Sequence, residues 1–98
     1  MANELTPELE AMLRKANKVV DDIVANLNGA CIATAQAWIA YLTEYVYASA
    51  AAVAALKEGD KEAAARHRLD ATCHRARADR KHKELRRAIE SLDNESSP

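Results

Sequence analysis

The sequence has few of the residues that break or turn a polypeptide. Its 98 residues include two Gly, two Pro and no Phe. A chain of short strands needs turn residues between them and is usually rich in aromatic side chains, so an all-β fold is excluded. Ala, the best helix former, is the commonest of the apolar residues, which make up 49% of the chain. We therefore predict an all-α chain that forms a single domain, residues 1–98.

The sequence also has few cysteines and no excess of charge. Two cysteines are too few for a disulfide framework. The amino-terminal segment does not combine basic residues with an apolar core and a cleavage site, which a secretory signal would require. There are 14 basic and 15 acidic side chains. A cytoplasmic protein with reduced thiols and no cofactor is the expectation.

The longest apolar stretch runs from Ala30 to Leu56, and Glu44 is its only charged residue. Two rows of residues in this stretch follow heptad spacing, which indicates one buried helical face. The rows are Ile32, Ile39, Val46, Val53 and Ala35, Leu42, Ser49, Leu56. The stretch is long enough to span a membrane, but a carboxylate at its centre costs about 2.5 to 3.5 kcal/mol on insertion scales. We therefore predict the central helix of a soluble bundle, with no membrane contact.

Three helices are predicted from their start and stop signals. Thr6-Pro7 is typical of a helix start, and Asn28-Gly29 and Glu58-Gly59-Asp60 are typical of breaks. The expected architecture is a three-helix up-down-up bundle. Its helices span about 6–27, 30–57 and 60–92, and a frayed tail covers 93–98. The alternative is an extended two-helix hairpin, in which one helix runs from Pro7 to Lys57, because a single Gly costs only about 1 kcal/mol inside a helix.

A second apolar row on the central helix predicts self-association. Cys31, Trp38, Tyr45 and Ala52 are spaced by seven residues. The third helix offers mainly alanines and polar side chains toward the bundle, too little bulk to cover both faces of the central helix. We therefore expect a homo-oligomer. The predicted interface residues are Trp38, Tyr41 and Tyr45.

Basic residues are concentrated in the third helix. The segment from Arg66 to Arg87 contains nine Lys or Arg residues and only three acids. Part of this charge can be neutralised locally, because several basic and acidic residues are four positions apart. Those pairs are Glu62 with Arg66, Arg66 with Asp70, Arg75 with Asp79, Asp79 with Lys83, and Arg80 with Glu84. The residues predicted to bind a partner or an anion are Arg66, Arg75, Arg77, Arg80, Lys81, Arg86 and Arg87.

Two arrangements of residues on the second and third helices contain groups that can carry out chemistry. His67, Asp70 and His74 share one side of the third helix, where they could hold a metal ion, but alanine-rich charged helices often contain such spacings. If the second and third helices pair antiparallel about Gly59, residues whose numbers sum to about 118 lie level. Glu44 then lies beside His74 and Arg75, as expected of a structural ion pair. We predict no metal site and no catalytic residue, hence no enzyme.

The sequence favours a non-enzymatic interaction protein of the adaptor or inhibitor type. It would self-associate through the central helix and engage an acidic protein surface with the basic third helix. The alternative is a binder of nucleic acid or of a nucleotide-type anion. In that case the arginines would contact phosphates and the aromatic residues of the central helix would stack on bases.

Overall fold

The protein is entirely helical in the residues that the structure describes. The computed structural model describes residues 5–26 and 29–96, with side chains for 5–25 and 31–91. The helices are α1 (Pro7–Asn26), α2 (Gly29–Lys57) and α3 (Lys61–Ser96). The predicted all-α class and the three helices are confirmed. The Asn28 part of the expected first break lies outside the described residues, and Gly29 is the first residue of α2.

Local hydrogen bonds explain where the helices begin and end. The Leu9 amide donates to Thr6 Oγ1 (3.2 Å), which caps α1, and the Ala63 amide donates to Asp60 Oδ1 (3.0 Å), which caps α3. At the end of α2 the amides of Asp60 and Gly59 donate to the carbonyls of Ala55 and Leu56. This is a Schellman motif, and Gly59 supplies its positive φ of 80°.

α3 is longer than the sequence predicted. It continues to Ser96 instead of ending at about Leu92, so most of the segment expected to be a frayed tail is helical. No Gly or Pro occurs between Gly59 and Pro98, so the sequence contains no residue that would stop the helix earlier. Only the residue before Pro98 is disfavoured in the α conformation.

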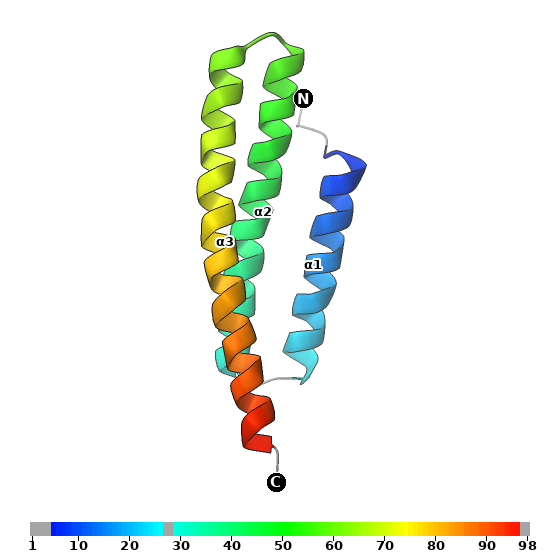
Figure 1. The fold of residues 1–98 in the computed structure, drawn as a ribbon. Coiled ribbons are helices and arrows are strands. Elements are labelled where there is room, and N and C mark those ends of the chain that lie inside the picture. The colour runs from blue at the N-terminus through cyan, green and yellow to red at the C-terminus, as the bar shows by residue number, and fades with distance from the viewer. Residues whose placement is uncertain (1–4, 27–28, 97–98) are drawn as a thin grey trace.

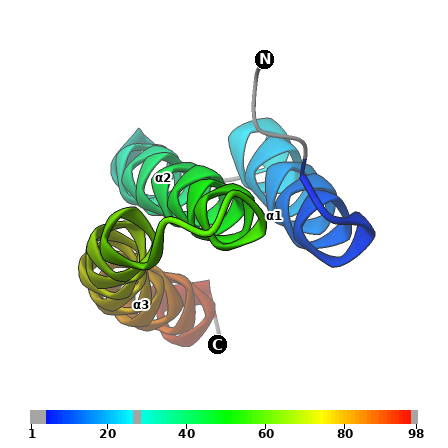
Figure 2. The same ribbon diagram turned by 90° about the horizontal axis from the view of Figure 1, so that it is seen from above.

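Consecutive helices run in opposite directions, and both α1 and α3 lie beside α2 (Figure 1). Seen from above, α1 and α3 flank α2 without closing on each other (Figure 2). α1 is a separate helix alongside α2, so the alternative of one helix from Pro7 to Lys57 is wrong. The molecule measures 60 × 20 × 17 Å.

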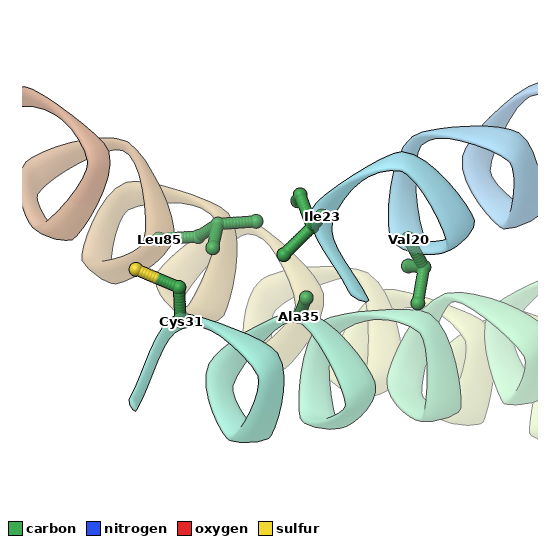
Figure 3. Close-up of a cluster of buried hydrophobic side chains, with 5 residues drawn as sticks. All are labelled: Val20, Ile23, Cys31, Ala35 and Leu85. Carbon is green, nitrogen blue, oxygen red and sulfur yellow. The ribbon is translucent and has the colours of Figure 1, made fainter. Parts of the chain in front are cut away.

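The core is divided between a region of larger side chains and a region of alanines. Val20 and Ile23 of α1, Cys31 and Ala35 of α2 and Leu85 of α3 form a buried cluster where all three helices meet (Figure 3). Nearer the turn at Gly59, α2 and α3 pack through small residues. The buried alanines of that region are Ala50, Ala52 and Ala55 on α2 and Ala64 and Ala71 on α3. Ala78 belongs to a second buried cluster, with Ala16 of α1 and Leu42 of α2. Small side chains allow the two helix axes to approach closely.

α1 covers only part of the apolar face of α2. Leu42 and Val46 are buried, but Val53 and Leu56, which lie further along the same heptad rows, are 39% and 43% exposed. α1 has 20 residues and α2 has 29, and α1 starts at Pro7, so about two turns of α2 near Gly59 extend past it. The end of the α2–α3 hairpin is therefore a two-helix structure with an apolar face open to solvent.

The segment Cys31–Lys57 of α2 is long and apolar enough to cross a membrane. The central helix of a water-soluble bundle meets the same criteria of length and composition. In an 18-residue apolar segment of this stretch, 28% of the residues are buried within the chain.

Candidate functional site

The basic residues of α3 lie along two edges of the helix, on either side of the buried alanine row. Arg68, Arg75 and Arg86 follow the edge that faces α1, and Arg66, Arg77 and Arg80 follow the opposite edge, with Arg87 on the outer surface. All of these arginines are exposed, whereas Lys81 is half-buried. The surface expected from the sequence is therefore present, but it is split between two edges.

Few of these cations have an acidic partner. Of the expected i,i+4 pairs, only Arg75–Asp79 forms (3.3 Å), and Lys81 pairs with Glu84 one turn away (3.1 Å). The remaining predicted site residues make no ion pair with any described residue. They are Arg66, Arg77, Arg80, Arg86 and Arg87. Local pairing therefore leaves most of the positive charge of α3 available to an external anion.

Arg75 differs from the other arginines because it joins all three helices. Its guanidinium carbon lies 5.1 Å from the centre of the Tyr45 ring, within the range of a cation–π contact. Its Nη1 lies 3.9 Å from Met12 Sδ of α1, and its Nε pairs with Asp79. The sequence indicated the pairing with Asp79, but no local signal points to Met12, which lies 63 residues away along the chain. Arg75 thus has a structural role in addition to any contact with a partner.

The aromatic residues of α2 contact other parts of the same chain. Trp38, Tyr41 and Tyr45 are half-buried and pack against the cluster formed by Ala16, Leu42 and Ala78. The Trp38 ring also lies 5.3 Å from the ring of His82. The bulk that was expected to require a second copy is thus partly covered by α1 and α3. The sequence analysis did not single out Tyr47, which is 52% exposed on the outer side of α2.

The prediction that Glu44 of α2 lies beside His74 of α3 is confirmed. His74 Nδ1 lies 3.1 Å from Glu44 Oε2, which becomes an ion pair when the imidazole is protonated. The two atoms are not aligned as a hydrogen bond requires, so the contact is purely electrostatic. The Glu44 side chain is 63% exposed. It is a surface carboxylate rather than a buried acid.

The structure does not assemble the candidate metal ligands. Within residues 5–26 and 29–96, no three His, Cys, Asp or Glu side chains converge closely enough to hold an ion. Of the two cysteines, Cys31 is buried and Cys73 is exposed. The prediction that the protein binds no metal remains to be tested.

Two hollows lie in line beside α3, on the side that faces α1. The lower hollow, of about 350 Å³, opens between α1 and α3. Its lining includes Met12, Ala16 and Val19 of α1, Trp38 and Leu42 of α2, and Arg75 and His82 of α3. The upper hollow, of about 380 Å³, lies beyond the start of α1 on the α2–α3 hairpin. It is lined by Ser49, Ala52, Val53 and Leu56 of α2 and by Arg68, Ala71 and Thr72 of α3.

No protein-family model, curated protein or solved structure matches this chain. Its function must therefore be argued from its own surfaces.

Proposed function

We propose that this protein is a non-enzymatic interaction protein, of the adaptor or inhibitor type, that engages an acidic macromolecular surface with α3. The observation that carries the proposal is the set of exposed arginines on α3 that lack an acidic partner among the described residues. They are Arg66, Arg77, Arg80, Arg86 and Arg87. The guanidinium group presents several donors in a fixed plane and binds carboxylates and phosphates through paired hydrogen bonds.

The small free energy of a single exposed ion pair favours a partner that contacts several arginines together. One exposed ion pair contributes about 0.2 to 1 kcal/mol, so a single contact gives little affinity. Arg80 and Arg87 are two turns apart on the exposed side of α3. An acidic surface that follows this side of the helix can engage both. Such a surface also accelerates association, because opposite charges steer the encounter.

The position of the aromatic residues favours a protein partner over nucleic acid. Single-stranded nucleic acid is usually held by bases stacked on exposed aromatic rings beside a basic groove. Trp38, Tyr41 and Tyr45 are engaged with α1 and α3 and are not on the outer surface of α3. Binding of nucleic acid through the phosphates alone remains the alternative outcome of the experiment below.

Self-association through α2 is part of the same proposal. The outward row Ala33, Ala40 and Tyr47 is exposed, and the predicted interface residues Trp38, Tyr41 and Tyr45 are only half-buried within the chain. The accessible surface is 6929 Å², whereas a compact protein of 10.7 kDa exposes about 5500 Å². A second copy packed on the outer face of α2 would remove part of this excess.

The proposal can be tested with two charge-reversal variants of equal net charge. Arg80→Glu with Arg87→Glu alters the outer side of α3, and Arg14→Glu with Lys18→Glu makes the same change in charge on exposed positions of α1. Each variant and the native protein are immobilised and exposed to lysate with and without nuclease treatment. We expect protein partners to survive nuclease, to be lost with the α3 variant and to be retained by the α1 variant.

Two results would contradict the proposal. Captured material that disappears after nuclease treatment would assign α3 to nucleic acid. In that case the logarithm of the affinity should fall with the logarithm of salt concentration, with a slope of about 0.9 per phosphate contacted on duplex. Equal capture by the α3 variant and the native protein, with unchanged helicity, would make the arginines of α3 an ordinary solvated surface.

A further inference from the structure

The two hollows beside α3 follow one another along the molecule, and the side chain of Arg75 lines the lower one. The lower hollow lies between α1 and α3, and its apolar lining comes mainly from Met12, Trp38 and Leu42. The upper hollow continues it along α2 and α3 past the first residues of α1. Arg75 lies beside Tyr45 and Met12. We call this surface, from Trp38 to Leu56 along α2, the α3 groove.

The heptad pattern shows why the α3 groove suits a helix. Ala35 and Leu42 pack against α1 within the core clusters, and their row continues through Ser49 to Leu56, which is 43% exposed. The upper hollow therefore presents the kind of face that α1 covers lower down. The floor of the hollow is made of Ser49, Ala52 and Ala71, whose small side chains leave room for the side chains of another helix.

The charge along the α3 groove is mainly positive. The charged residues that line the two hollows are Lys15, Arg68, Arg75 and Asp79, which are three cations and one acid. The only acid among them is already paired with Arg75. The hairpin turn at the upper end adds no net positive charge, because Lys57 and Lys61 are exposed together with Glu58, Asp60 and Glu62. An occupant with acidic side chains on its flanks would meet complementary charge at Lys15 in the lower hollow and at Arg68 in the upper hollow.

We propose that the α3 groove binds one amphipathic helix of a partner protein, with an apolar face toward α2 and acidic residues on its flanks. The groove spans residues 38 to 56 of α2, which at 1.5 Å per residue is about 27 Å, so the helix has about 18 residues. Its apolar face packs on Trp38, Val53 and Leu56, and its acids face Lys15 and Arg68. The mode is that of a helix laid in an apolar groove. The inference rests on the proposed function, and it names the shape and chemistry of the acidic partner.

A second copy of this chain is a poorer occupant of the same groove. Two copies related by a twofold axis present the same patch to each other. Each copy would then contribute Lys15, Arg68 and Arg75 against a single acid, Asp79, and like charges at an interface oppose association. The outer face of α2, which carries Ala33, Ala40 and Tyr47, lies outside the groove and stays available for self-association.

The test uses a synthetic helix as the probe. An 18-residue peptide carries leucines at heptad a and d positions and glutamates at e and g, and a fluorescent label reports binding through anisotropy. A matched control peptide has the same leucines with lysines in place of the glutamates. We expect the glutamate peptide to bind with an affinity about tenfold or more higher at low salt, because exposed ion pairs replace repulsions. Equal affinity for the two peptides would overturn the proposal.

Two pairs of variants locate the binding site. Arg68→Glu should weaken binding of the glutamate peptide about fivefold or more, and Arg66→Glu, on the opposite edge of α3, should change it less than twofold. Leu56→Glu in the groove should weaken binding, and Leu69→Glu should not, because Leu69 is 66% exposed and lines neither hollow. Equal effects within either pair would refute the location. A native dimer that Leu56→Glu dissociates would assign the groove to a second copy instead.

The experiments distinguish a failure of the groove proposal from a failure of the proposed function. Arg80 and Arg87 line neither hollow, so the double variant Arg80→Glu with Arg87→Glu should retain binding of the peptide. If partners depend on Arg80 and Arg87 but the peptide does not bind, the groove proposal fails alone. If the peptide binds with the expected specificity and the double variant retains every partner, the proposed role of Arg80 and Arg87 is refuted and the groove proposal is supported.

Discussion

Replacing Leu85 by alanine tests how much of the stability depends on the site where the three helices meet. Leu85 is 2% exposed and packs with Val20, Ile23, Cys31 and Ala35. Removing a buried leucine side chain to alanine costs about 2 to 5 kcal/mol, which combines lost burial with the cavity left behind. The neighbours on α2 are short side chains that cannot fill the space, so we expect about 3 kcal/mol. For a chain of this length that lowers Tm by about 15 °C.

The matched control is Leu69→Ala. It makes the same chemical change on the same helix, but Leu69 is 66% exposed, so the free energy of unfolding should change by less than about 0.5 kcal/mol. Urea unfolding followed by circular dichroism at 222 nm measures both variants. Equal losses in the two variants, or a loss below about 1 kcal/mol for Leu85→Ala, would show that the shared three-helix cluster does not carry the stability of the fold.

Three further predictions follow from the helix contacts and the turn. Ala78 is 1% exposed between α2 and α3, so Ala78→Leu should lower the free energy of unfolding by about 1 to 3 kcal/mol in urea titrations, whereas Ala76→Leu on the exposed side should be nearly neutral. Gly59→Ala should lower the free energy of unfolding by about 1 kcal/mol, because the backbone at this position has a φ of +80°, which disfavours any residue with a Cβ. No atom lies within 4 Å of the added Cβ, so no steric clash adds to this cost. An unchanged Tm would mean that the turn has another conformation. A chelator should leave the Tm unchanged, since no metal-binding cluster exists among the described residues; loss of helicity with chelator, abolished by His74→Ala, would contradict this.

The fold followed from local signals and from one geometric rule. Thr6, Pro7, Gly29 and Gly59 mark the helix boundaries to within about a residue, because capping and glycine conformations act over a single turn. An antiparallel hairpin around Gly59 fixes which residues lie level, and this predicted the approach of Glu44 to His74. The predicted end of α3 at about Leu92 is wrong, because a polar composition alone does not end a helix and no Gly or Pro occurs between Gly59 and Pro98.

The candidate site was less predictable because it depends on side-chain geometry. Spacing alone cannot distinguish the pair that forms, Arg75–Asp79, from Arg80 and Glu84, which make no ion pair with each other. The electrostatic free energy gained by an exposed ion pair is little larger than the side-chain entropy lost when the pair forms. The contact of Arg75 with Met12 depends on where α1 docks, which no local pattern specifies. The length difference between α1 and α2 was readable from the sequence, and it would have indicated the uncovered end of the hairpin.

The elongated shape affects how the size of the particle in solution is measured. The radius of gyration is 16.2 Å, whereas a compact chain of this length has about 13 Å. Friction on a rod 60 Å long and 20 Å wide exceeds that on a sphere of equal mass. A single copy will therefore elute early from a gel-filtration column calibrated with globular standards and will resemble a larger species. Sedimentation equilibrium or light scattering reports mass independently of this drag, and only these methods distinguish a true pair of chains from one extended chain.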